Sequence, residues 1–284
     1  MSLLNVLAGL VLSAAVSLAG YWRGSLSPSG LLGAMAIGTL IFSFGGLAWA
    51  LLLIAFFVTS SGLSHYRVHA KEPLAEKFQK GHRRDLGQVL ANGGWGALLA
   101  LAFGFWPQTT WLVAFVGAMS TVNADTWATE LGVLSSAPPR LITSGHVVPV
   151  GTSGGITLLG ILVSLAGALV IGCLALVFVL VNPWFPFPLL PALSLPPRGL
   201  WLLLVPIAAL SGLLGSLFDS LLGATVQAIY YCDFDKKETE SAVHRCGRKT
   251  RLIRGWRWLD NDWVNLLASV FGSGVALALY FAAG

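Results

Sequence analysis

Charged residues are scarce in this chain. Only 10% of its 284 residues are Asp, Glu, Lys or Arg, whereas hydrophobic residues make up 56% and the mean hydropathy is +0.77. A soluble domain usually carries about a quarter charged residues. Because a single core cannot bury so large an apolar surplus, the composition excludes an ordinary soluble fold. It predicts an all-α, polytopic integral membrane protein whose residues 1–284 form one transmembrane domain.

Cysteine is also rare, and the chain has only three: Cys173, Cys232 and Cys246. Their spacing matches no metal-binding or disulfide motif, so we expect ordinary thiols and no disulfide-stabilised scaffold. The five histidines likewise lack the spacing of metal ligands, and none is assigned a role: His65, His69, His82, His146 and His244.

Long apolar runs predict about eight transmembrane helices. A helix needs roughly 20 apolar residues to cross a bilayer, so one helix over 28–63 would be too long, and we divide it at Gly45 and Gly46. The first run lacks a basic segment and a clear cleavage site, so we expect a retained span and not a signal peptide. The expected spans lie at about 3–21, 28–44, 47–63, 86–105, 109–133, 154–181, 200–230 and 262–282.

The basic residues fall almost entirely on one side of these spans. All of the 17 Lys and Arg residues except Arg198, which lies in the proline-rich linker 182–198, belong to connections on the same side, chiefly 64–85 and 231–259. The positive-inside rule makes these two loops cytoplasmic and places both termini outside, in what we expect to be the cytoplasmic membrane. The net charge of +5 then sets orientation, and we expect no nucleic-acid partner.

Acidic and amide side chains interrupt the apolar runs near the predicted cytoplasmic face, above all in NADTWATELG, residues 123–132. A carboxylate inside a bilayer costs about 2.5–3.5 kcal/mol on insertion scales, so it normally faces an interior site and has a partner. Five separate segments bring such oxygens to one depth, and one of them is the loop VPVGTSGG, 148–155. The side chains are Asp85, Asn92, Asn123, Asp125, Glu130, Asp219, Asp260, Asn261, Asp262 and Asn265.

Two interpretations explain the intramembrane acids: they pair with Arg or Lys to hold helices together, or they bind a cation. No basic residue lies within the apolar runs to pair with Asp125, Glu130 or Asp219, which favours the cation. Ligand sets made only of oxygen suit Mg²⁺, which usually comes with phosphate and water. We therefore predict these three acids as metal ligands.

The spacing of the first two acids sets a geometric condition. Asp125 and Glu130 are five residues apart, so they point about 140° from each other on a regular helix. Either the helix is interrupted here or the two acids serve different ligands.

Phosphate contacts are predicted around the segment GTSGG. Its glycines let backbone N–H groups approach an anion, and the N-terminus of the following helix is electropositive. Arg140 lies nearby in the sequence, and the run KGHRRD contains Arg84. This run contacts a polyphosphate or an anionic headgroup, or it only sets orientation. The predicted phosphate- or substrate-binding residues are Arg84, Asn92, Asn123, Arg140, Gly151, Thr152, Ser153, Gly154, Gly155, Asn261 and Asn265.

These motifs together resemble a known family. NADTWATELG, PRLITSGHVVPVGTSGGITLLG, DSLLGATVQ and LDNDWVNLLAS occur in this order over most of the chain. They closely resemble the domain-of-unknown-function 92 family, which includes transmembrane protein 19 and the plant phytyl-phosphate kinases of tocopherol synthesis. Those kinases convert an isoprenyl monophosphate to the diphosphate with a nucleoside triphosphate, CTP being favoured. A fainter similarity to dolichol kinases and CDP-diacylglycerol synthases also implies a CTP-linked lipid enzyme.

The resemblance and the acids together predict a Mg²⁺-dependent prenyl-phosphate kinase. Phosphoryl transfer depends mainly on positioning and charge neutralisation. Asp125, Glu130 and Asp219 are thus the expected catalytic residues, holding Mg²⁺ between the donor and acceptor phosphates. The expected partners are the nucleotide, the isoprenyl monophosphate with its tail in lipid, and membrane lipids, and an oligomer is compatible with the sequence.

Two other functions are compatible with parts of the sequence. An ion-coupled transporter or permease for a small anionic or lipid substrate also uses intramembrane acids and Gly-rich helices. Against it, the polar residues gather at the inner face instead of the midplane, and no convincing inverted repeat is visible. A non-catalytic scaffold leaves the acids unexplained.

Overall fold

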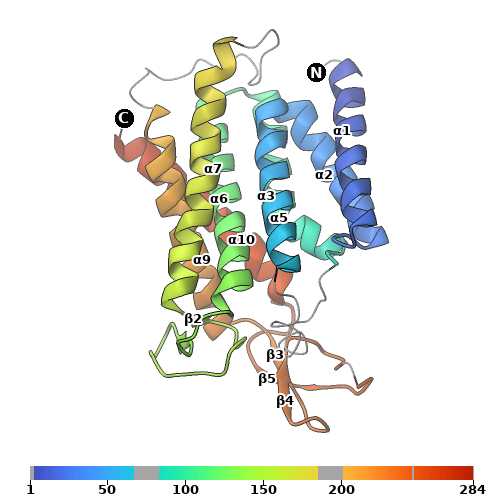
Figure 1. Cartoon of the computed structure of the whole chain (residues 1–284), viewed down its shortest axis with the longest axis vertical. Coiled ribbons are helices and arrows are strands. Elements are labelled where there is room, and N and C mark those ends of the chain that lie inside the picture. Colours follow the sequence, from blue (N-terminus) through green and yellow to red (C-terminus); the bar gives the residue numbers. More distant parts are fainter. Residues whose placement is uncertain (1–2, 67–82, 185–200, 245, 284) are drawn as a thin grey trace.

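The computed structural model describes residues 3–66, 83–184, 201–244 and 246–283. Within these ranges, eight long helices form one bundle (Figure 1). They are α1 (Leu3–Trp22), α2 (Pro28–Gly45), α3 (Leu47–His65), α5 (Leu86–Phe105), α6 (Thr109–Gly132), α7 (Leu158–Val181), α9 (Leu204–Thr225) and α10 (Asn261–Ala283). A short 3-10 turn, η2 (Asn182–Trp184), follows α7. Most of the expected loop 64–85 and of the linker 182–198 lies outside the described residues.

The helices confirm a multi-pass integral membrane protein. Seven of the eight, all except α6, are long and apolar enough to cross a membrane by length and composition. Helix α6 is 24 residues long and packs against α7, α9 and α10, and every residue from Leu112 to Ala124 is buried. Because α6 is enclosed by other helices and not by lipid, it can carry the polar stretch NADTWATELG.

The division of the second long apolar run is confirmed. Helix α2 ends at Gly45, and α3 begins at Leu47. Between them Gly46 has φ of +87°, a backbone conformation that glycine adopts readily because it has no Cβ. At the other end of α2, the Ser27 side chain accepts a hydrogen bond from the N–H of Gly30 and caps the helix, and Pro28 follows at the first helical position.

Small residues bring α6 and its neighbours into close contact. A Cβ atom on Gly215 of α9 or on Gly272 of α10 would collide with the side chain of Thr121 on α6. The Thr121 hydroxyl donates to the carbonyl of Ser211 on α9 at 3.1 Å. Such contacts are typical of membrane helices, which associate through tight packing and interhelical hydrogen bonds because lipid removes the hydrophobic driving force between them.

The all-α membrane fold is confirmed, and short strands are added to it only outside the bundle. The predicted loop 231–259 contributes to a three-stranded antiparallel sheet of order β4-β3-β5, and β1 (Arg140–Leu141) pairs with β2 (Gly155–Ile156). The three strands are β3 (Ile229–Cys232), β4 (Lys237–Thr239) and β5 (Arg251–Arg254). Helix α9 ends at Thr225, and the segment IYYC that follows is rich in the aromatic and β-branched residues that favour strands. Apolar content alone does not separate these residues from the preceding span.

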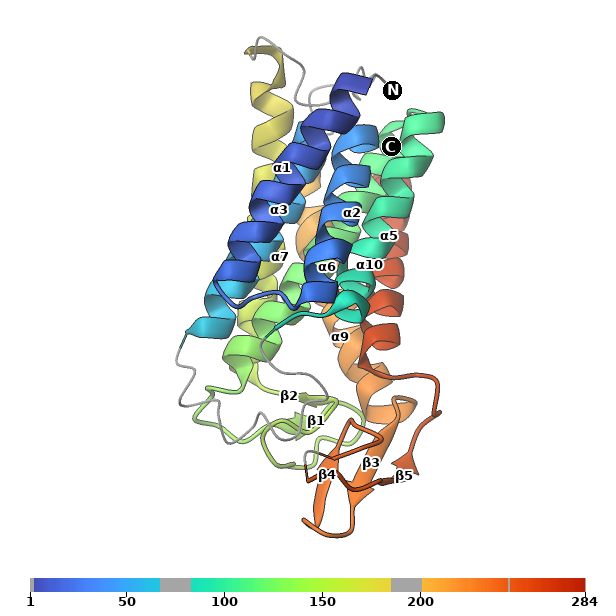
Figure 2. The ribbon, with the colours of Figure 1, turned by 90° about the vertical axis from the view of Figure 1, so that its right-hand side faces the viewer.

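All five strands lie at one end of the bundle, and Leu3 and Ala283 lie at the other end (Figure 2). This arrangement follows from eight helices that alternate in direction. The side of the membrane that each end faces stays a prediction from the basic residues.

Reporter fusions would test this orientation. A cytoplasmic reporter fused after Arg84 should be active, and the same reporter at Gly284 should be inactive, because basic loops are retained inside. A periplasmic or lumenal reporter serves as the matched control and should give the opposite pattern. Both fusion points on the same side of the membrane would contradict the orientation.

A second test concerns Asn123, which joins three helices in the core. Its Nδ2 donates to the carbonyl of Gly167 on α7 at 2.8 Å, and its Oδ1 accepts from the Thr59 hydroxyl on α3 at 3.1 Å. Asn123→Leu removes the donor to the buried carbonyl of Gly167 and the link to Thr59, so it should lower Tm, at a cost of about 1–3 kcal/mol. Gln108→Leu, at the exposed start of the same helix, should leave Tm unchanged. Loss of activity without a change in Tm would instead support the substrate-binding role predicted from the sequence.

Candidate active site

A cavity of about 530 Å³ lies at the strand-bearing end of the bundle. Side chains from α3, α5, α6, α7, α9 and α10 line it, together with the segment 150–157. Six helices that are far apart in the sequence therefore bring polar groups to one place, as the sequence predicted.

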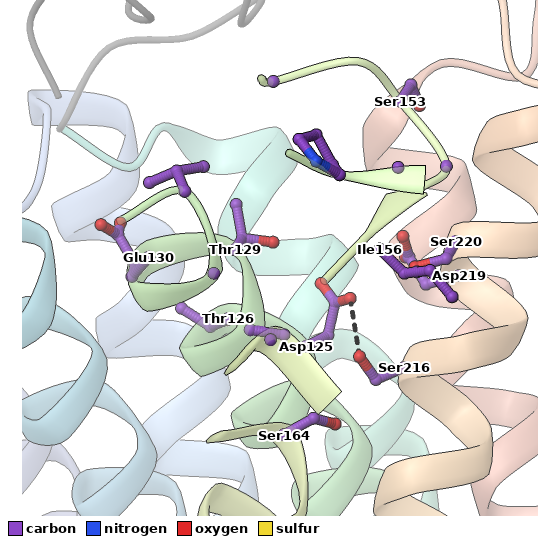
Figure 3. Close-up of a pocket in the computed structure, with 18 of the residues that line it drawn as sticks. Asp125, Thr126, Thr129, Glu130, Ser153, Ile156, Ser164, Ser216, Asp219 and Ser220 are labelled. Atoms are coloured by element: carbon purple, nitrogen blue, oxygen red, sulfur yellow. Dashed lines mark hydrogen bonds between the residues drawn. The ribbon is translucent and has the colours of Figure 1, made fainter. Parts of the chain in front are cut away.

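Asp125 on α6 and Asp219 on α9 lie within electrostatic range of each other in this cavity. Asp125 Oδ1 accepts a hydrogen bond from the Ser216 hydroxyl at 3.4 Å (Figure 3). The negative charges of Asp125 and Glu240 both act on Asp219. Asp219 Oδ2 is buried and has no hydrogen-bond partner among the residues that the structure describes. Two neighbouring buried carboxylates are costly unless a cation or a proton neutralises them, so this pair suits a hard cation.

Glu130 lies apart from this pair and faces α3 (Figure 3). Helix α6 is unbroken from Thr109 to Gly132, so the second of the two geometric alternatives holds: the acids serve different partners. Glu130 Oε1 accepts from the Ser64 hydroxyl at 2.6 Å, and its charge acts on Arg84. Arg84 lies outside the apolar runs but is close enough for its charge to act on Glu130, so a basic residue compensates this acid although none lies within the runs.

Arg84 is held rigidly in the cavity wall. Its backbone N–H donates to the carbonyl of Ser25, its carbonyl accepts from the N–H of Ser27, both at 3.0 Å, and Nη1 donates to the Ser61 hydroxyl at 2.9 Å. Burial lowers the pKa of Arg84, and the charge of Glu130 opposes this shift. Since a guanidinium remains protonated in proteins, the wall carries a fixed positive charge here.

The GTSGG segment lines the cavity, but several of its N–H groups are already used. The Thr152 N–H donates to the carbonyl of Pro149 at 3.1 Å, and the Gly155 N–H donates to the carbonyl of Thr152 at 2.9 Å. Gly154 has φ of +82°, and a Cβ there would lie 2.6 Å from the backbone of Ala224 on α9. Fewer amides are therefore available to an anion than the sequence predicted, and Gly154 is needed for close packing.

A chain of side chains connects this segment to the sheet. The Ser153 hydroxyl donates to Gln227 Oε1 at 2.6 Å, and Gln227 Nε2 donates to Glu240 Oε1 at 2.9 Å. Gln227 is buried, and Arg254 on β5 donates to the carbonyl of Gly223 at 2.8 Å. Gln227, just before β3, and Glu240, just after β4, thus form one side of the cavity wall.

Most of the predicted residues reach the cavity, but two do not. Asn123 lies in the helix core, and Arg140 is exposed and donates to the carbonyl of Gly145 in its own loop at 2.9 Å. Those that line the cavity are Arg84, Asn92, Asp125, Glu130, Gly151, Thr152, Ser153, Gly154, Gly155, Asp219, Asn261 and Asn265.

Asp85 and Asp260, which the sequence grouped with the oxygen ligands, instead cap helices. Asp85 forms a capping box with Gln88 at the start of α5. Asp260 Oδ1 accepts from the N–H groups of Asp262 and Trp263 at the start of α10, at 3.1 and 3.2 Å.

Sequence reasoning missed several polar residues of the lining. They are Ser64, Gln88, Thr126, Thr129, Ser164, Ser216, Ser220, Gln227 and Glu240. The recurrence of Ser216, Asp219 and Ser220 on one helical face was the available signal. Isolated Ser and Thr residues elsewhere gave no such signal, because their hydroxyls often donate a hydrogen bond to the backbone of their own membrane helix.

Comparisons with known proteins place the chain in a family. The family model described as "Integral membrane protein DUF92" matches residues 11–273. The chain is 34% identical over 278 residues to Protein PGR of Arabidopsis thaliana, covering 93% of this chain and 92% of that protein. It is 29% identical to the uncharacterized membrane protein MJ0933 of Methanocaldococcus jannaschii, covering 90% and 86%.

A third relative is Protein VTE6, chloroplastic, of Arabidopsis thaliana. The identity is 26% over 259 residues, which cover 89% of this chain and 65% of that protein. No solved structure shows significant similarity. The family model spans nearly the whole chain and the identity to Protein PGR is well above chance, so this protein belongs to the DUF92 family of integral membrane proteins.

Proposed function

We propose that this protein is a Mg²⁺-dependent kinase that transfers a phosphoryl group from a nucleoside triphosphate, CTP being favoured, to an isoprenyl monophosphate. The observation that carries the proposal is the pair Asp125 and Asp219, two half-buried neighbouring carboxylates in a cavity at the loop end of the bundle, with Asp219 Oδ2 buried and without a hydrogen-bond partner among the described residues. The reaction class comes from the family resemblance, which includes prenyl-phosphate kinases.

The charge of the cavity supports a metal–phosphate ligand. Its described walls carry five carboxylates and one guanidinium. Such a site repels a bare phosphate but attracts a divalent cation, and all the donors near Asp125 and Asp219 are oxygens, as Mg²⁺ prefers. Asp125 and Asp219 would hold the ion, and Mg²⁺ supplies neutralisation of the phosphate oxygens.

The remaining side chains have roles that follow from their positions. Arg84 would contact a phosphate oxygen, held in place by Glu130 and Ser61. Asn261 and Asn265 on α10 would orient oxygens or water molecules. A phosphate monoester is largely ionised near pH 7, so the acceptor needs no strong general base.

A second cavity supports a lipid acceptor. It has a volume of about 70 Å³, lies among α1, α2, α3 and α5, and is lined mostly by apolar residues such as Val16, Ile37 and Phe56. It shares Arg84, Gln88 and Asn92 with the polar cavity. A phosphate held at Arg84 would therefore have an apolar slot beside it for the first isoprene units.

The central test is a double-mutant cycle on phosphate transfer. Transfer from radiolabelled CTP to a panel of prenyl monophosphates is measured in purified micelles. Asp125→Asn and Asp219→Asn should each reduce the rate at least about 100-fold, and the double variant should lose little more, because both side chains hold one ligand. Asp233→Asn, an exposed acid of the sheet region, is the matched control and should retain activity.

The transporter alternative predicts a different result. Uptake of a substrate into proteoliposomes without nucleotide hydrolysis, with no prenyl diphosphate formed, would overturn the kinase proposal. Full activity in a well-folded Asp125→Asn protein would also contradict it.

The apolar slot gives a separate prediction. Ala34 lines it, so Ala34→Phe should fill the slot and raise KM for the prenyl monophosphate about tenfold, equivalent to ~1.4 kcal/mol of binding, without changing KM for CTP. Ala36→Phe, on an exposed face of the same helix, should change neither constant. An equal rise in both KM values would show a general disturbance of the bundle instead of a lipid site.

A further inference from the structure

Four side chains with metal-binding atoms meet in the β3–β5 sheet region, outside the cavity. One ligand atom from each of Cys232, Asp235, His244 and Cys246 lies within 4.8 Å of the others. The two sulfur atoms are 3.7 Å apart, and His244 Nδ1 is 3.3 Å from Cys246 Sγ and 2.8 Å from Asp235 Oδ2. The spacing of these residues along the chain gave no sign that the two thiols and the histidine lie together.

The sheet explains how distant residues converge. Cys232 ends β3, Asp235 lies in the turn to β4, and His244 and Cys246 lie in the tight turn that leads to β5. In that turn the His244 N–H donates to the carbonyl of Arg248 at 3.0 Å, and Gly247 has φ of +80°. The antiparallel pairing of β3 with both neighbours brings the two turns to the same place.

The distances and the burial suit a metal ion better than a chance surface cluster. Two thiolates bound to one tetrahedral Zn²⁺ at about 2.3 Å each are ~3.8 Å apart. Cys232 is 0% exposed and His244 is 6% exposed. His244 Nδ1 points toward both Asp235 and Cys246, so one imidazole nitrogen is directed at the centre of the cluster.

We propose that Cys232, Asp235, His244 and Cys246 form a structural Zn²⁺ site. Two thiolates and an imidazole select Zn²⁺ over Mg²⁺, whereas the acids of the cavity have the opposite preference. Four protein ligands complete a tetrahedral shell and leave no position for substrate, which is the arrangement of a structural site. Binding releases the two thiol protons to solvent and leaves His244 neutral.

The proposed ion would stabilise one wall of the cavity. Glu240 lies between β4 and His244 in the sequence, and it is joined through Gln227 to Ser153. A metal ion bound by ligands from both turns would restrict the motion of the segment that carries Glu240. Asp125 and Asp219 lie on α6 and α9, which contribute no ligand to the proposed Zn²⁺ site. The proposal of this site therefore does not depend on the proposed kinase activity.

Metal analysis of the full chain in micelles tests the site directly. Protein purified under reducing conditions should contain about one Zn²⁺ per chain by mass spectrometry of the metal, as one tetrahedral site requires. Cys246→Ser and His244→Ala should lose it. Cys173→Ser removes a thiol exposed on α7 and should keep the full amount. The variant Asp125→Asn with Asp219→Asn should also keep it, which separates this site from the cavity.

Cobalt binding can be measured on the wild-type protein, so this test does not depend on whether a variant folds. Wild-type protein stripped of metal and loaded with Co²⁺ should show thiolate-to-cobalt charge transfer and the d–d bands of tetrahedral Co²⁺. Absence of these bands, together with no Zn²⁺ uptake by the reduced protein, would overturn the proposal. So would a Cys232–Cys246 disulfide in protein that binds no zinc, or equal zinc in wild type, Cys246→Ser and His244→Ala.

Discussion

The burial of Asp125 beside Asp219 is the interaction on which the polar end of this bundle depends. Each carboxylate would cost several kcal/mol in an apolar environment, and their mutual repulsion adds to that cost. Close packing of α6 against α9 nevertheless keeps them together: Gly212 and Gly215 bring α9 onto Ser120 and Thr121, one turn from the acids. The divalent cation that we propose for the cavity would neutralise the two acids that the packing brings together.

The loop end of the molecule is organised by a different kind of contact. Hydrogen bonds join the GTSGG segment to the sheet through Ser153, Gln227 and Glu240. The same sheet gathers two thiols, an imidazole and a carboxylate. Hard oxygen donors in the cavity and softer sulfur donors in the sheet are chemically distinct, so two different divalent ions can be sorted within one small protein.

Hydropathy was sufficient for the helices because the bilayer imposes their length and composition. It located the break at Gly46 and the helices that carry the acids. It did not reveal that the charge of Arg84 acts on Glu130, because Arg84 belongs to a segment outside the apolar runs that folds back to the cavity. The sequence also placed Asn123 in the substrate site, whereas its amide bonds two neighbouring helices. An amide in either position looks the same in a single sequence.

The sequence by itself determined the membrane class, the number of long helices, the family and most of the charged residues that line the cavity, since each of these depends on local composition or on contiguous motifs. Tertiary structure alone decided which acids share a partner and whether Cys232, His244 and Cys246 meet. Helical rotation separates Asp125 from Glu130, although they are only five positions apart. Strand pairing does the reverse and brings together residues whose spacing matches no motif, because register, and not separation along the chain, sets the distance across a sheet.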